Sequence, residues 1–322
     1  MAPMTLAAFA SRVAPKLNPL IWESLRDYMS PGNRDFGWIG QIFNIQATNR
    51  LIHEFSNQES AEAWQPGTEL SPYPVQEWDL PTDQTFGQII YKSSFIVSEM
   101  QLKYGDPQLH VFPKLADYLQ DFSLGAMKAY NRRAGAILLD MFTGALLTCP
   151  DGQPLISNTH TKGTNPTVYD NALDLALSAA AIDAAYALNT AEDMQDATGD
   201  PLTTNFDTLV IGMRNRRIAN ELIKNQYKHG ATNEENNYDR WSITKIVECP
   251  WFNGSLGTQN WWMLIDSGSH WLRGLVTESP NVRIANAAGG PDQLQFYGRS
   301  IFNFLYNDFP GVIASTGATA TT

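Results

Sequence analysis

One very long helix is predicted by residues 113–143, whose sequence is PKLADYLQDFSLGAMKAYNRRAGAILLDMFT. Apolar residues recur there at intervals of three and four, which places them on one broad helical face: Leu115, Leu119, Phe122, Ala126, Ala129, Ile137 and Met141. Pro113 suits a first helical turn, and Gly144 suits the left-handed residue that ends a helix. At 1.5 Å per residue the helix would be roughly 45 Å long, whereas ordinary globular helices have about 11–12 residues. We therefore expect a strut for a flat or elongated protein.

Two glycines, Gly125 and Gly135, lie inside the predicted helix, where each costs about 1 kcal/mol relative to Ala. They predict that another element crosses the helix closely there.

The composition is that of a globular protein that does not bind nucleic acid tightly through its phosphates. The chain has 322 residues, 43% of them hydrophobic and 17% charged, so one large or two modest domains can bury a substantial core. The formal net charge is −11, whereas proteins that hold DNA through its phosphates are usually basic. An ordinary acidic soluble protein is the plainer interpretation of the same charge.

Two cysteines, Cys149 and Cys249, are far apart and lack the spacing of a multi-cysteine zinc site or a disulfide framework. We expect two buried free thiols in a reducing cytoplasm. The first residues do not have the pattern of a signal peptide, and no run of about 18 apolar residues predicts a membrane span.

An acidic segment at residues 56–86 follows a weakly patterned N-terminal arm at residues 1–55. The segment carries four prolines and several acidic residues but neither Lys nor Arg. It is too long for an ordinary connection. The alternation at residues 87–100 predicts a strand, so the two segments together predict a long hairpin with an acidic tip.

The C-terminal half predicts a second, α/β-type lobe. Asp151-Gly152 is a turn signal, and strands are expected at these ranges: 208–212, 242–248, 260–266 and 272–278. Helices are expected at 173–188, which is rich in Ala, and at 214–224. Further strands are expected at 293–305 and around Val312 and Ile313, before a tail without packing signals.

Enzyme chemistry is not supported by the sequence. Asp151, Ser157 and His160 could form a hydrolase triad, but a triad depends on geometry and no nucleophile-elbow motif is present. The plainer interpretation is a hairpin whose polar side chains bond to backbone. The five histidines are scattered without metal-ligand spacing. The sequence therefore predicts no catalytic, cofactor-binding or metal-binding residues.

The pair Arg132-Arg133 lies on the predicted strut. Such a pair is most often a solvated face, but it could also receive the acidic hairpin of a neighbouring copy, since complementary charges fix partner and register. The hypothetical contact residues are these: Glu69, Glu77, Trp78, Asp79, Asp83, Arg132 and Arg133.

Four stretches of the chain, in this order, resemble the major capsid proteins of tailed bacteriophages. They are FNIQATNR at 43–50, YKSSFIVSEM with LKYG at 91–105, DGQPLISNTH at 151–160 and NWWMLID at 260–266. Each stretch alone is weakly specific, whereas their order makes the resemblance fairly specific over residues 35–315.

The resemblance implies an α+β fold of the Hong Kong 97 type. Its parts would be an N-terminal arm at 1–55, an extended loop (E-loop) at 56–92 and a P-domain at 93–150 with its spine helix at 113–143. An A-domain would follow at 151–278, then returning P-domain strands at 279–315 and a disordered tail at 316–322. Some relatives cross-link through a lysine of the E-loop, which this chain lacks between Leu51 and Tyr91.

By the same resemblance the chain would assemble as hexamers and pentamers into an icosahedral head around double-stranded DNA. Expected partners are other copies of itself, portal and scaffold proteins and, as an open alternative, a decoration protein. The DNA would be enclosed without sequence-specific binding, and no membrane would be involved. We expect assembly in the host bacterial cytoplasm and a final location in the virion. The alternatives are an encapsulin-type compartment, which encloses a cargo enzyme, and a hydrolase using Ser157 and His160.

Overall fold

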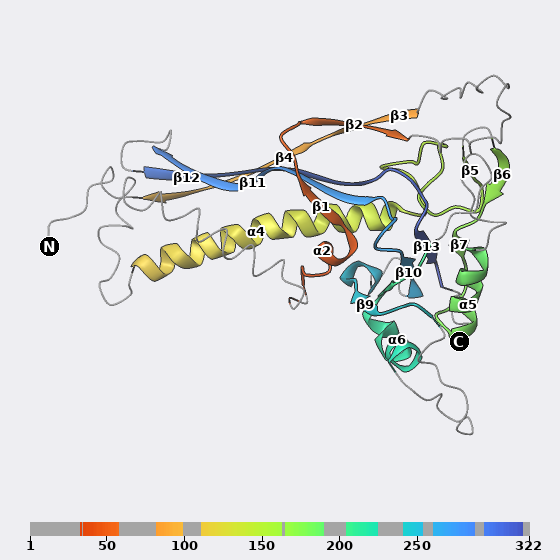
Figure 1. The fold of residues 1–322 in the computed structure, drawn as a ribbon. Coiled ribbons are helices and arrows are strands. Elements are labelled where there is room, and N and C mark those ends of the chain that lie inside the picture. Colours follow the sequence, from red (N-terminus) through yellow and green to blue (C-terminus); the bar gives the residue numbers. More distant parts are fainter. Residues whose placement is uncertain are drawn as a thin grey trace, which may run out of the picture. The chain divides into compact units, whose positions relative to one another are not determined.

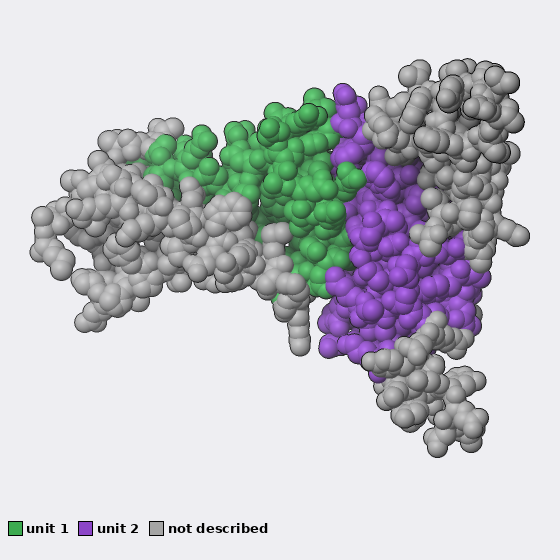
Figure 2. Space-filling view, in the orientation of Figure 1, with its two compact units in different colours: residues 1–53, 87–135, 273–304 green, residues 54–86, 136–272, 305–322 purple. Residues whose placement is uncertain are grey.

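The computed structural model of this protein describes the following residues: 33, 35–57, 82–98, 111–162, 165–189, 204–224, 241–253, 260–286 and 293–317. Two compact units, coloured separately in Figure 2, divide the chain. Unit 1 contains residues 1–53, 87–135 and 273–304, and unit 2 contains residues 54–86, 136–272 and 305–322. The chain passes between the units several times, so neither unit is one continuous segment.

The predicted long helix is α4, Val111–Asp140, with 30 residues. It begins two residues before Pro113 and ends at Asp140, three residues earlier than expected. Gly144 has a φ of +61° and donates its N–H to the carbonyl of Asp140 at 2.9 Å, so the predicted left-handed exit is confirmed. The Asp140 carboxylate accepts N–H bonds from Ala145, Leu146 and Leu147, which fixes the chain just after the helix.

Unit 1 is a four-stranded sheet with the order β1-β11-β12-β4, and α4 runs along it (Figure 1). The strands are β1 Asn44–Ala47, β4 Ile89–Ser98, β11 Leu272–Asn286 and β12 Gln293–Tyr306. β12 pairs antiparallel with β4, and β1 pairs parallel with β11. Aromatic rings join the helix to the sheet: Tyr130 stacks on Phe302 with centroids 3.7 Å apart, and Phe122 meets Phe95 edge to face at 5.4 Å.

The close approach expected at Gly125 of α4 is wrong at that residue. A Cβ on Gly125 would meet nothing within 4 Å, because Gly125, Ala126 and Ala129 line a cavity of about 240 Å³. The sheet supplies the close approach instead: a Cβ on Gly298 of β12 would lie 2.2 Å from the ring of Phe122. Glycine is therefore required where the helix ring presses on the strand.

The N-terminal region is more integrated than the expected arm. Helix α2, Ile39–Ile42, is buried together with Trp38 and Phe43, and the Phe43 ring lies 5.0 Å from that of Phe304. Residues 36–43 of the expected arm thus contribute to the core of unit 1. The predicted hairpin has different strands: β2, Ile52–Asn57, pairs with β3, Thr82–Gly87, whereas the strand expected at 87–100 is β4, which pairs with β12. Residues 58–81 lie outside the described part.

Unit 2 is built on a five-stranded sheet with the order β7-β13-β10-β8-β9. Its strands are β7 Ala172–Leu173, β8 Thr208–Ile211, β9 Lys245–Glu248, β10 Trp262–Ile265 and β13 Val312–Ser315. Helices α5, Ala179–Leu188, and α6, Arg216–Ile223, accompany this sheet, with short 3-10 turns at Met213–Asn215 and Pro250–Asn253. A separate hairpin pairs β5, His160–Lys162, with β6, Asn165–Tyr169.

Several expected boundaries move. The Ala-rich helix starts at residue 179 rather than 173, because the Ser178 hydroxyl caps it by accepting the Ala181 N–H. The strand expected at 272–278 extends to Asn286 and pairs in the sheet of unit 1, whereas Val312–Ser315 pairs in the sheet of unit 2. Residues 316 and 317 of the expected tail are described, and the Thr316 N–H donates to the Leu173 carbonyl.

In the described part of the chain no helix is both long and apolar enough to cross a membrane.

Candidate functional site

The two arginines predicted to contact a neighbouring copy, Arg132 and Arg133, have different surroundings in the structure. Arg132 is exposed on α4. Arg133 is partly buried and donates its Nε–H to the Asn303 side-chain oxygen at 2.9 Å, while the Asn303 amide donates to the Gly87 carbonyl at 2.8 Å. Arg133 therefore joins the helix to β12 within one chain, and Arg132 is the arginine of the pair that faces solvent.

The members of the predicted contact set that belong to the acidic segment cannot be placed in the same way. Glu69, Glu77, Trp78 and Asp79 lie outside the described residues. Asp83 belongs to β3, which pairs with β2. The sequence analysis thus gives this set its charge pattern, and the structure gives the position of its base.

The face of the unit 1 sheet that points away from α4 is a surface that the sequence analysis missed. Tyr91, Phe95 and Val97 of β4 contribute to the aromatic and buried side of the sheet. The alternate residues Ile90 and Ile96 are 51% and 53% exposed. The strict alternation of β4 was the signal that could have identified this apolar outer face.

Charged residues interrupt the same outer face. Lys92, Arg283 and Arg299 line a hollow of about 320 Å³ together with Tyr297, which is 40% exposed. Arg299 donates its Nε–H to the Glu278 carboxylate at 2.6 Å. Exposed isoleucines beside cations suit contact with an acidic partner that also has apolar side chains.

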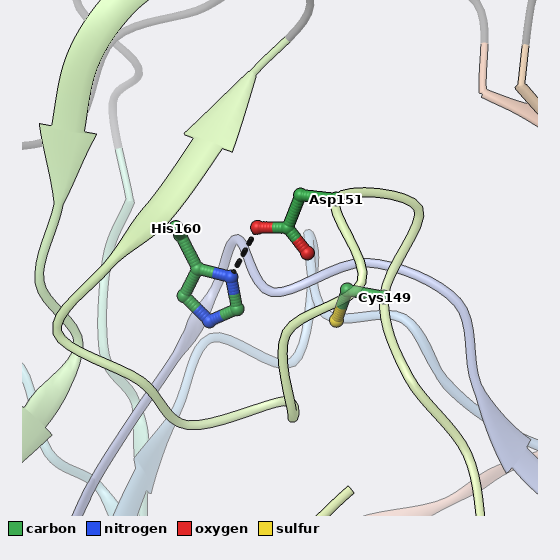
Figure 3. Close-up of side chains that lie close together, drawn as sticks. All are labelled: Cys149, Asp151 and His160. Atoms are coloured by element: carbon green, nitrogen blue, oxygen red, sulfur yellow. Dashed lines mark hydrogen bonds and ion pairs between the residues drawn. The ribbon is translucent and has the colours of Figure 1, made fainter.

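The residues of the suspected triad fall into two parts in unit 2. His160 is fully buried, and its Nδ1 lies 2.7 Å from the Asp151 Oδ2 (Figure 3). Its Nε2 lies 3.1 Å from the Leu155 carbonyl, whereas Ser157 bonds to Thr159, with the two hydroxyl oxygens 3.0 Å apart. The two imidazole nitrogens face Asp151 and Leu155 rather than the Ser157 hydroxyl, so Asp151, Ser157 and His160 do not form the suspected triad.

The Asp151 and His160 contact is held from several sides. The Asp151 carboxylate also accepts the N–H groups of Gln153 and Thr161, and the His160 ring stacks on Phe309 with centroids 4.1 Å apart. Burial alone would raise the pKa of Asp151, but the hydrogen bonds from His160, Gln153 and Thr161 outweigh it and hold the pKa below its usual value.

Cys149 lies beside this pair (Figure 3). Atoms of Cys149, Asp151 and His160 that can bind a metal all lie within 4.8 Å of one another. Burial, and then the charges of Asp308 and Asp151, raise the pKa of the Cys149 thiol. Both cysteines are free and buried as expected. The cluster has no regular ligand spacing in the sequence, because the turn that holds Cys149 and Asp151 folds back on the strand that holds His160.

Asn171 is a further residue that sequence reasoning missed. It is fully buried, and its amide donates to the carbonyls of Leu155 and Val312 while its oxygen accepts the Ser157 N–H. One side chain thus ties the 155–157 segment to β13. Nothing in the sequence pattern distinguishes this Asn from the others.

Comparisons with known proteins identify the fold. A family model described as phage capsid protein matches residues 94–315, which is more than half of the chain. Among solved structures, the capsid of an empty GTA particle matches with a TM-score of 0.52 and 14% identity, covering 89% of this chain and 91% of that one. The chain therefore has the Hong Kong 97-type capsid fold, as the resemblance implied.

Two further structures are similar at lower scores. A virus-like particle from Pyrococcus furiosus matches at a TM-score of 0.45 and 10% identity, covering 94% of this chain and 99% of that one. The procapsid of bacteriophage JBD30 matches at 0.47 and 10% identity, covering 98% and 77%. The sequence search against curated proteins gave no significant match.

Proposed function

Because this chain belongs to the phage capsid protein family, whose model spans residues 94–315, we propose that it is the major capsid protein of a tailed bacteriophage. Copies of the chain assemble as hexamers and pentamers and close an icosahedral head around double-stranded DNA. The family match is the observation that carries this proposal, since it includes α4 and strands of both larger sheets.

The charge of the chain agrees with a container for DNA. A net charge of −11 opposes tight binding of phosphates, so enclosed DNA stays free of sequence-specific contacts. Portal and scaffold proteins direct assembly in the host cytoplasm, and a decoration protein is an optional further partner.

The acidic segment of one copy contacts a neighbouring copy. Glu69, Glu77, Trp78, Asp79 and Asp83 supply negative and aromatic side chains, and the neighbour offers exposed Arg132 on α4. Arg133 adds positive charge near the same contact while its side chain donates a hydrogen bond to Asn303. Such pairs select the partner and its register more than they add affinity.

Electron microscopy tests assembly. Protein purified after expression with its scaffold should form closed hollow shells. Small discrete oligomers under every assembly condition would contradict the proposal. Nuclease-protected phage DNA inside particles from infected cells distinguishes a phage head from an encapsulin-type compartment, which would hold a cargo enzyme instead.

A charge swap tests the contact. Arg132→Glu and Glu77→Arg should each lower shell yield, and the double variant should recover part of it. Arg217→Glu is a matched control, because Arg217 is also a helical arginine with a highly exposed side chain. Equal shell yields for Arg132→Glu and Arg217→Glu would show that Arg132 does not take part in the contact.

A further inference from the structure

The contact between His160 and Asp151 requires a cation. Nε2 of His160 faces the Leu155 carbonyl at 3.1 Å, and a carbonyl can only accept, so Nε2 carries the proton of a neutral ring. The lone pair of Nδ1 then faces the Asp151 Oδ2 at 2.7 Å. Two acceptors repel each other at that distance, and therefore either a second proton or a metal ion belongs between them.

Cys149 favours the metal ion over a second proton. A proton needs only the histidine and the carboxylate, whereas a third donor of a different kind stands beside them. The sulfur of Cys149, a carboxylate oxygen of Asp151 and a ring nitrogen of His160 lie within 4.8 Å of one another. Figure 3 shows Cys149 and Asp151 on one turn next to the imidazole. Thiolate, imidazole and carboxylate together are the donor set that zinc prefers.

We propose that Cys149, Asp151 and His160 bind a Zn²⁺ ion through Sγ, Oδ2 and Nδ1. The ion replaces the thiol proton and any proton on Nδ1, and both leave to solvent. Thiolate, carboxylate and neutral imidazole then balance the two positive charges. Tetrahedral zinc bonds of about 2.3 Å to sulfur and about 2.0–2.2 Å to nitrogen and oxygen place neighbouring ligand atoms about 3.3–3.6 Å apart. Binding therefore requires Nδ1 and Oδ2 to separate from their 2.7 Å contact and the sulfur to move inward from a cluster that spans up to 4.8 Å. A water molecule completes the tetrahedron.

The surroundings of the three residues match those of zinc ligands. A histidine that binds zinc usually donates its other N–H to a carbonyl or carboxylate, as Nε2 does here to Leu155. The Leu155 carbonyl is itself fixed by the Asn171 amide at 2.9 Å. The second Asp151 oxygen is fixed by the Gln153 N–H at 3.0 Å. The ligands are shielded from solvent, since His160 and Cys149 are 0% and 1% exposed.

Metal analysis of the full chain, purified without chelators, tests the proposal. We expect zinc in nearly equimolar amount with the protein. Cys149→Ser should reduce it at least tenfold, and Cys249→Ser should keep it, because Cys249 is also buried and free but lies apart from any such cluster among the described residues. Equal zinc in both variants would overturn the proposal.

A second measurement needs no variant that could fail to fold. Adding Co²⁺ to chelator-treated wild-type protein should produce a thiolate-to-cobalt charge-transfer band, and adding Zn²⁺ should raise Tm by mass action. Absence of both effects would overturn the proposal and leave a proton between His160 and Asp151. The outcome is independent of shell assembly, so it can fail while the capsid function stands.

Discussion

The two larger sheets of the protein are built on opposite plans. In unit 2, every residue of β8, β10 and β13 is buried. In unit 1, β4 alternates, with Phe95 stacked on Phe296 at 4.6 Å and its neighbour Ile96 53% exposed. The strands β8, β10 and β13 of unit 2 thus bury their hydrophobic side chains within one chain. The sheet of unit 1 leaves Ile90 and Ile96 exposed on its outer face, which is the difference expected between a folding core and an assembly surface.

The largest expected effect comes from breaking the buried sheet. Leu264 in the middle of β10 is 0% exposed, so Leu264→Ala should lower the free energy of unfolding by about 2–5 kcal/mol through lost burial and a residual cavity. Leu146→Ala, at a residue that is 52% exposed in the same unit, is the control. Denaturant unfolding measures both, and similar losses would refute the contrast between buried and exposed leucines.

A smaller effect is expected where the sheet of unit 1 meets α4. Gly298→Ala should cost about 1–3 kcal/mol, because its methyl would overlap the Phe122 ring. Gly125→Ala should instead be neutral or stabilising by up to about 1 kcal/mol, since its Cβ has open space in a helix interior. Thermal unfolding of the two variants checks this opposition, and a stabilised Gly298→Ala would contradict the close approach.

Acid titration of the chelator-treated, metal-free protein tests the Asp151 contact. The pKa of Asp151 is below its usual value, because hydrogen bonds outweigh the effect of burial. Its ionised form therefore stabilises the fold above a pH of about 4, and this contribution is lost as the pH falls through the lowered pKa. The free energy of unfolding should thus fall more steeply below about pH 4 in the wild type than in Asp151→Asn. Parallel curves would show that Asp151 contributes no such slope.

The smallest effect on folding is expected at the outer face of the unit 1 sheet. Ile96→Ser should change the free energy of unfolding by within about 0.5 kcal/mol, because the side chain is already half exposed. If this face is an assembly surface, shell yield should nevertheless fall. Monomer unfolding and particle counts measured on the same preparation separate the two effects. An unchanged shell yield would show that this face is not an assembly surface.

Periodicity made the regular elements of the fold predictable. The long helix, β4 and β8 were found within a few residues because their patterns repeat over whole turns or alternations. The start of α5 was wrong because the Ser178 cap decides it, and a cap outweighs an Ala-rich composition. The sheet to which β11 belongs was missed because strand pairing depends on distant residues.

The candidate sites were predictable only in part. Charge pattern identified Arg132 and Arg133, but the bond from Arg133 to Asn303 joins residues 170 positions apart. The metal-ligand cluster was hidden for the same reason, because Cys149 and His160 meet through a turn whose path the sequence does not specify. The sequence gives the residue types, whereas contacts between residues distant in sequence depend on the tertiary fold.

The pairing of β12 and β13 has a consequence for synthesis on the ribosome. β12 pairs with β4, and β13 pairs with β7 and β10, so each strand emerges after the partners that it completes. Residues 301–315 are buried throughout. Until this segment leaves the exit tunnel, both larger sheets lack a strand and expose edges that invite wrong pairing. A nascent chain therefore cannot present a finished subunit until residues 301–315 have emerged.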